Sequence, residues 1–316
     1  MRRGRMTMVA ASAVAALAVA GCGGGSAAGP VAFTDEPEDA LEVWGFENAD
    51  DVGQSRLDHA AAQLDGVEIE IDAAAFDAQR FTAQAASGDL PDVVQMDRNF
   101  VATYAAQGLI VPLDECLALH DVDAEERWYP QVAADVTYDD QLWGVPQFYQ
   151  PPLILLNERV VAEAGLDASA FDVTDPDALV AAVEQLTVLD GDTPTRLGFD
   201  PQGVSKAALW MLAMGGSIVD EDGVPSLDDP ANVEAIELLQ RLYDAQGGYA
   251  QVRSFVDAFD LFGDGNPYVT DQVAAAVFDQ WYVNVLTPYA DQVELAATPM
   301  LGTDGEPFTA ASGQAF

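Results

Sequence analysis

A set of aromatic, amide and charged side chains lies at the ends of the predicted strands or within a proline-rich stretch in the middle of the chain. The aromatic members are Trp44, Tyr149, Trp281 and Tyr282, and the polar members are Glu47, Asp97, Arg98, Gln147 and Gln280. Indole and phenol rings lie flat on apolar C–H faces, while amides and carboxylates hydrogen-bond hydroxyl groups. This is the chemistry of binding a polyhydroxylated molecule such as a sugar. For each polar residue, a solvated loop position is an equally good interpretation.

Two further features have a functional and a structural interpretation. Gly215 and Gly216 follow a predicted helix, where the absence of a Cβ lets backbone amides approach a ligand. The same pair is also what ends a helix. Trp210 lies in the middle of that helix and is more typical of a core residue than of a ligand contact, and Trp44 ends a strand, where tryptophans often pack between elements.

The sequence gives little support for a metal site, a phosphate-binding site or a catalytic site. His59 and His120 are isolated and fit no zinc spacing. Asp220 to Gly223 resembles part of a calcium loop but lacks its closing glutamate. No phosphate-binding loop or Gly-x-Ser-x-Gly motif is present. We expect no catalytic residue, metal or cofactor. A glycan hydrolase that uses paired carboxylates stays an alternative, because acidic residues are spread along the whole chain.

The elements that position these residues are organised around a stretch at 142–157. An aromatic hairpin, 138–146, leads into Gln147–Pro152, which the two prolines keep extended. The apolar run 153–156 that follows is typical of a buried strand. We interpret 147–152 as the place where the chain crosses from one lobe to another, with Gln and Tyr side chains at a cleft.

Strands and helices alternate on both sides of the crossing. Before it, strands are predicted at 41–46, 67–71 and 92–96, with helices at 50–64 and 77–86. After it, helices are predicted at 176–188, 204–214 and 230–245, strands at 196–199, 272–278 and 293–296, and a hairpin at 218–225. Alternation of this kind indicates α/β lobes, the first with a largely parallel sheet. The strand at 293–296 is the expected return crossing.

The first residues read as a processing signal. Arg2, Arg3 and Arg5 precede a short apolar stretch, Met6 to Ala20, and a small-residue site that ends at Cys22. Such a site looks like a bacterial lipobox, in which Cys22 carries lipid. We therefore expect a signal peptide at 1–21, a flexible tether at 22–39, export, and lipid anchoring at the outer face of the cytoplasmic membrane.

The net charge and the cysteine content limit which binding partners and which disulfides are expected. The chain has 12 basic and 53 acidic residues, a formal net charge of −41, which would repel nucleic acid. With Cys22 lipidated, Cys116 has no partner for an intrachain disulfide and is expected to pack as a small apolar residue.

Six features recur in the order and spacing of one family. They are the lipobox, Trp44-Gly45, Ser87-Gly88-Asp89-Leu90-Pro91-Asp92-Val93, Trp143-Gly144-Val145-Pro146, Gly215-Gly216-Ser217 with the Asp222-Gly223 hairpin, and Asp279-Gln280-Trp281. In these features the chain resembles the extracellular solute-binding proteins of ABC transporters, in particular the sugar-binding lipoproteins of family 1. The resemblance extends over essentially the whole mature chain.

The resemblance implies a fold and a function. The fold is α/β, with two lobes of the type II periplasmic-binding-protein kind and a ligand cleft between them: an N-terminal lobe at 40–146, to which 300–316 return, and a C-terminal lobe at 147–299. The function implied is a monomeric, non-enzymatic receptor that captures a sugar or oligosaccharide and delivers it to a membrane permease. A peptide or polyamine ligand is the alternative within this fold. Family members usually run longer, so we interpret the chain as C-terminally truncated.

Overall fold

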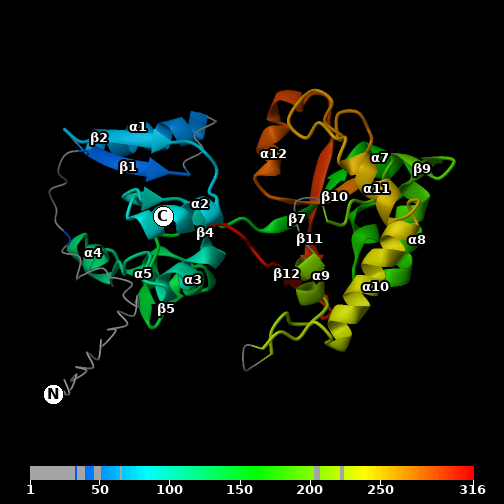
Figure 1. Ribbon diagram of the computed structural model, residues 1–316. Coiled ribbons are helices and arrows are strands. Elements are labelled where there is room, and N and C mark those ends of the chain that lie inside the picture. Colours follow the sequence, from blue (N-terminus) through cyan, green and yellow to red (C-terminus); the bar gives the residue numbers. More distant parts are fainter. Residues whose placement is uncertain (1–32, 34–39, 46–50, 65, 203–206, 221–223) are drawn as a thin grey trace, which may run out of the picture.

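A computed structural model describes residue 33 and residues 40–45, 51–64, 66–202, 207–220 and 224–316. Figure 1 shows two lobes side by side, joined by two strand-like segments that run between them. The predicted signal peptide, the tether with Cys22, and Glu47 lie outside the described residues.

The first lobe is built on a parallel sheet. Its elements are β1 (Ala40–Trp44), α1 (Asp51–Gln63), β2 (Glu68–Asp72), α2 (Ala78–Ser87), β3 (Val93–Val94), β4 (Met96–Asp97), the 3-10 helix η1 (Arg98–Phe100), α3 (Val101–Ala106), α4 (Asp114–Leu119), α5 (Ala124–Arg127), α6 (Pro130–Asp135), β5 (Thr137–Tyr138) and β6 (Gln141–Leu142). Strands β2 and β3 both pair with β1 in parallel. This confirms the parallel sheet that the sequence predicts.

Local signals explain where the helix α2 begins and ends. The Asp77 side chain accepts a hydrogen bond from the Arg80 N–H at the N-cap, and Gly88 ends the helix in the left-handed conformation, at φ 74°. The prediction of a helix that stops at Ser87-Gly88 is confirmed.

The second lobe holds the remaining elements. They are β7 (Pro152–Asn157), α7 (Glu158–Glu163), η2 (Ala168–Phe171), α8 (Pro176–Leu186), β8 (Val188–Asp190), β9 (Thr193–Arg196), α9 (Ala207–Ala213), α10 (Pro230–Asp244), α11 (Tyr249–Val256), β10 (Ala275–Asp279), α12 (Tyr282–Val285), η3 (Thr287–Tyr289), β11 (Leu295–Leu301) and β12 (Pro307–Phe308). The last strand, β13 (Gln314–Ala315), returns to the first lobe and pairs with β4.

The central sheet of the second lobe corrects one prediction. Its order is β10-β7-β11-β12, and β7 pairs with both β10 and β11 in antiparallel register. The segment expected to be the return crossing, 293–296, therefore leads into β11 inside this lobe. The apolar pattern of β11 fits an internal strand as well as a crossing, and only the pairing distinguishes the two.

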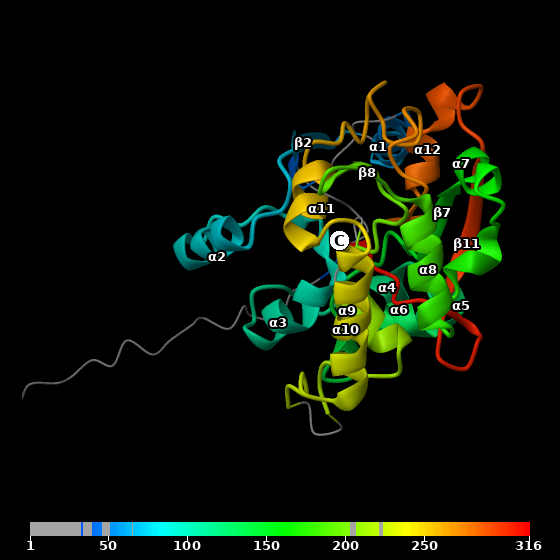
Figure 2. The ribbon, with the colours of Figure 1, turned by 90° about the vertical axis from the view of Figure 1, so that its right-hand side faces the viewer.

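Each lobe has its own apolar core. In the first, Trp44, Phe81, Met96, Tyr104 and Ala315 pack together. In the second, β7, β10 and helices α8 and α10 enclose a larger core in which Trp210 is fully buried, as expected for it. Helices α8 and α10 lie side by side in both views (Figures 1 and 2). Two separate cores let each lobe move as a unit.

Candidate binding site

Two chain segments join the lobes, and they are hydrogen-bonded to each other. The outgoing segment, 145–150, runs antiparallel to the returning segment, 312–316. Val145 N–H donates to Phe316 O at 2.8 Å and Phe316 N–H donates back at 3.0 Å, while Gln150 and Ser312 exchange the same pair of bonds at 3.0 and 3.2 Å. The connection is therefore a two-stranded ribbon. This ribbon of 145–150 and 312–316 is called the crossing ribbon below.

A cavity of about 540 Å³ opens beside the crossing ribbon and is lined from both lobes. Its lining residues are Asp97, Arg98, Asn99 and Asp135 from the first lobe, Gln150, Ala310, Ala311, Ser312 and Gly313 from the crossing region, and Ala208, Leu209, Leu212 and Asp279 from the second lobe. We call it the inter-lobe cleft. Two of the polar residues predicted from sequence, Asp97 and Arg98, lie in it.

The lining combines hydrogen-bond acceptors with an apolar surface. Asp97 and Asp279 stand on opposite lobes, Gln150 supplies an amide, and Leu209 and Leu212 come from one helix, α9. Burial raises the pKa of the Asp279 carboxyl, and a hydrogen bond with the Trp281 side chain partly offsets this. Carboxylates and an amide beside leucines form a surface that accepts hydroxyl groups and covers C–H groups.

Arg98 lines the cleft, but its side chain is hydrogen-bonded to other residues of the protein. It is 3% exposed, and its guanidinium donates to the carboxylate of Asp135 and to the backbone oxygens of Phe148, Ala311 and Ser312. These bonds occupy most of its donors. The structure places Arg98 at the inter-lobe cleft, and its hydrogen-bond partners there belong to the protein.

Gln147 and Tyr149 belong to the crossing ribbon, and Gln280 is hydrogen-bonded to it. Gln147 Oε1 accepts from Gln95 Nε2, and Gln280 Nε2 donates to the backbone oxygen of Tyr149 at 3.2 Å. The Tyr149 ring lies 5.4 Å from the Tyr129 ring, and with Gln147 it lines a second cavity of about 550 Å³. The side chains of Gln147 and Tyr149 therefore face a neighbouring groove, while Gln150 faces the inter-lobe cleft.

Trp281 and Tyr282 follow β10 but lie differently. Trp281 is half-buried, with its ring parallel to Phe262 at 6.4 Å, and it contacts Asp279 of the cleft. Tyr282 is fully buried, and its hydroxyl accepts from Asn266 Nδ2 at 2.7 Å and donates to Leu261 O at 2.9 Å. The structure therefore places Tyr282 in the core and away from the cleft, because α12 begins there and turns the side chain inward.

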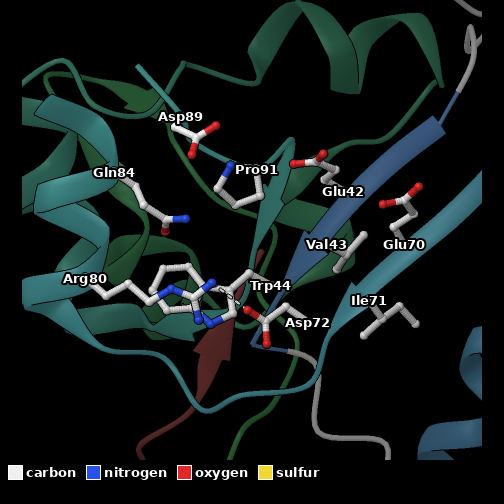
Figure 3. Close-up of a pocket in the computed structure, with 10 residues that line it drawn as sticks. All are labelled: Glu42, Val43, Trp44, Glu70, Ile71, Asp72, Arg80, Gln84, Asp89 and Pro91. Atoms are coloured by element: carbon white, nitrogen blue, oxygen red, sulfur yellow. Dashed lines mark hydrogen bonds and ion pairs between the residues drawn. The ribbon is translucent and has the colours of Figure 1, made fainter. Parts of the chain in front are cut away.

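Trp44 also lies in a core rather than in the inter-lobe cleft. It is 1% exposed, and the Arg80 guanidinium lies 4.3 Å from its ring centroid (Figure 3). Arg80 is ion-paired with Asp72 at 2.5 Å, and the carboxylates of Glu42, Glu70 and Asp89 surround the same pocket of about 300 Å³. Because the arginine covers the indole, this pocket offers no free tryptophan face.

The glycine pair has structural partners as well. Gly215 adopts φ 83° and its N–H donates to Leu212 O just after α9, as a helix terminator does. A Cβ on Gly216 would overlap the Asn232 side chain of α10. Neither glycine is among the residues that line the inter-lobe cleft. The helix-ending interpretation fits both.

Sequence reasoning missed Gln150, Asp135 and Asp279. Gln150 precedes the two prolines and alternates with Tyr149 along an extended segment, so its opposite orientation could have been inferred. Asp279 stands in the Asp279-Gln280-Trp281 motif itself. Asp135 carries no local signal, because only the folding of α6 against Arg98 brings it to the cleft.

No group of three or more histidine, cysteine or acidic side chains among the described residues is arranged to hold a metal ion. In the same part of the chain, no helix has both the length and the apolar character needed to cross a membrane.

Similar folds occur among solved structures. CpMnBP1 with mannotriose bound superposes with a TM-score of 0.75 at 22% identity, over 88% of this chain and 73% of that one. The GacH receptor of Streptomyces glaucescens, solved unliganded and with acarbose, gives 0.68 at 20% identity, over 89% and 71%. Maltose-bound MalE3 of T. maritima gives 0.67 at 17%, over 88% and 71%. The chain has their two-lobe type II periplasmic-binding-protein fold.

No curated protein sequence matches the chain. The family model described as bacterial extracellular solute-binding protein, however, matches residues 57–315. The match spans both lobes and the crossing ribbon. The chain therefore belongs to the family of bacterial extracellular solute-binding proteins.

Proposed function

We propose that this protein is the substrate-binding component of an ABC importer and that it captures a sugar or oligosaccharide in the inter-lobe cleft. The observation that carries the proposal is the composition of the cleft. Carboxylates from both lobes, the Gln150 amide and the α9 leucines surround one cavity of about 540 Å³. A ligand held there touches both lobes at once, so its binding favours the closed arrangement of the lobes over the open one.

A neutral polyol fits this lining better than an anion does. Asp97 and Asp279 accept hydrogen bonds and repel negative groups, while Leu209 and Leu212 cover C–H faces. The relatives of the same fold were solved with mannotriose, acarbose or maltose. These support a sugar as the ligand class. A polyamine is the competing ligand, because the same carboxylates would attract a cation.

Anchoring and delivery complete the proposal. Cys22 carries lipid, residues 22–39 form the tether, and the protein works as a monomer at the outer face of the cytoplasmic membrane, where a permease accepts its closed form. The test is expression of the full chain in bacteria fed a labelled fatty acid. The proposal requires label in the protein and its loss in Cys22→Ser. Equal labelling of both would contradict the anchor.

Titration calorimetry tests the ligand class. The chain from Ser26 onward is titrated with mono- and oligosaccharides, with spermidine and with a short peptide, and each mixture is then analysed for new reducing ends. Saturable binding of one sugar class without products supports the proposal. Binding of spermidine alone would identify the ligand as a polyamine. Steady release of reducing ends would show that the protein is a hydrolase and not a receptor.

A further inference from the structure

Arg98 is a buried charge with an unusually complete set of partners. A guanidinium that is 3% exposed is strongly destabilising unless its donors are satisfied. Arg98 Nε donates to Asp135 Oδ2 at 3.1 Å, Nη1 donates to Phe148 O, and Nη2 donates to Ser312 O at 3.1 Å and Ala311 O at 3.4 Å. Its planar fork suits several acceptors at once, which a lysine ammonium does not reproduce.

The acceptors belong to three different segments. Asp135 ends α6 in the first lobe, Phe148 lies in the outgoing segment, Ser312 begins the returning segment, and Ala311 directly precedes it. The backbone adds to this, because Arg98 N–H donates to Gly313 O at 3.1 Å. Arg98 thus holds both segments of the crossing ribbon to the first lobe with one side chain, in addition to the pairing of β13 with β4.

The Arg98 side chain can take this position because residue 313 is a glycine. A Cβ at position 313 would overlap both Arg98 Nη1 and Phe148 O. The guanidinium therefore passes through a space that only a residue without a side chain leaves open. The cleft shares these atoms, since Arg98, Ser312 and Gly313 all line it.

We propose that Arg98, admitted by Gly313, is a positioning residue that clamps the whole crossing ribbon to the first lobe. Residues 145–150 and 312–316 then move with that lobe. The bending that opens and closes the cleft is confined to Pro151, just before β7, and to 309–310, between β12 and the clamp. The lobe boundary predicted at 146/147 accordingly shifts to 150/151. Only the link from this clamp to ligand capture rests on the proposed function.

Pro151 and residues 309–310 suit the role of bending points. Pro151 lies between Gln150, the last residue of the ribbon, and Pro152, which starts β7 and pairs with Asp279. Thr309 and Ala310 are exposed, and they follow the short strand β12. A few residues at the ends of elements are what absorb the backbone change in hinge motions.

The test measures the free protein, so it needs no ligand. Spin labels on Ser87→Cys in α2 and Gln240→Cys in α10, in a Cys116→Ser background of the chain from Ser26 onward, report the distance between the lobes. Arg98→Met keeps a long side chain but removes every donor. We expect a clearly broader distance distribution than in the parent. Arg80→Met is the matched control, because it removes another arginine of the first lobe that is ion-paired, with Asp72, outside the cleft.

Hydrogen exchange supplies a second measurement on the same variants. The amides of Val145, Gln147, Gln150, Ser312 and Phe316 hold the ribbon together. In Arg98→Met their exchange should accelerate about tenfold or more, the loss expected for one charge-assisted hydrogen bond. Arg98→Lys should rescue little. In Arg80→Met the ribbon amides should exchange as in the parent.

Gly313→Ala keeps the arginine and its charge but removes the space for it, so it should reproduce the effects of Arg98→Met. If Arg98→Met does not fold, Gly313→Ala and Arg98→Lys carry the test. Unchanged lobe distances and unchanged ribbon exchange in a folded Arg98 or Gly313 variant would overturn the clamp. Failure of every sugar to bind, with the ribbon loosened in these variants, would overturn the proposed function alone.

Discussion

The guanidinium of Arg98 lies where a side chain at position 313 would be, so the arginine and Gly313 form one structural feature. This feature ties the first lobe to both segments of the crossing ribbon, and it lines the inter-lobe cleft. In the proposed clamp, stability, hinge motion and ligand binding depend on the same few atoms.

Gly313→Ala should destabilise the fold. The added Cβ forces Arg98 or the Phe148 carbonyl to move, and overpacking of this kind costs about 1–3 kcal/mol. Urea unfolding of the variant and the parent measures the difference. Gly66→Ala is the control, because a Cβ there meets open space and only the positive φ of 88° opposes it. A Gly313→Ala protein no less stable than Gly66→Ala would contradict the close approach of Arg98.

Tyr282→Phe should lower stability without weakening ligand binding. Loss of the hydroxyl removes one hydrogen bond from the buried Asn266 amide and one from the Leu261 carbonyl. We expect the free energy of unfolding to fall by about 1–3 kcal/mol. Thermal unfolding and titration of the same sample separate the two effects. A variant that is as stable as the parent but binds sugar more weakly would contradict this prediction. It would support Tyr282 as a ligand-binding residue, as predicted from sequence.

Asp279 should make part of the stability depend on pH. Burial raises its pKa in the folded protein above 3.8, the ordinary value for an aspartate, so the folded state takes up the proton first as pH falls. Relative to Asp279→Asn, the parent should therefore gain stability as pH falls through the raised pKa. That gain should be complete below 3.8. The measurement is the difference in unfolding free energy between the two proteins across acid pH, and a parent that loses stability relative to the variant would contradict the burial.

Trp281→Ala should weaken sugar binding by about 1–3 kcal/mol if the ring stacks on the ligand, as aromatic platforms do. The ring contacts Asp279 of the cleft on one side and lies parallel to Phe262 on the other. Phe262→Ala removes that neighbour, which is 67% exposed, and serves as the control. A folded Trp281→Ala protein with normal affinity would remove Trp281 from the site.

The helices could be predicted because their signals are local. Asp77, Asp175 and Asp229 each accept a backbone N–H at a helix start, and the last two are followed by proline at the first helical position. Asp220 and Val224 pair as the predicted hairpin requires, although the turn itself lies outside the described residues. The helix α8 ends at Leu186, two residues earlier than expected.

The pairing of the strands and the residues of the cleft could be learned only from the structure. The antiparallel order around β7 joins segments more than a hundred residues apart, and no local pattern specifies it. Asp135 reaches the cleft only through the folding of α6 against Arg98, which no local pattern specifies either. The sequence prediction put Tyr282 at the end of a strand, but it is the first residue of α12 and the buried residue of that helix.

The most direct test of the central claim compares sugar affinity in three proteins. They are the chain from Ser26 onward, its Gln150→Ala variant in the cleft, and its Arg80→Met variant in the separate pocket of Figure 3. Titration with the best sugar of the panel should show affinity lowered about five- to thirtyfold by Gln150→Ala, the loss of one or two hydrogen bonds, and unchanged by Arg80→Met. Sugar binding that Gln150→Ala leaves intact and Arg80→Met abolishes, with all three proteins folded, would contradict the account.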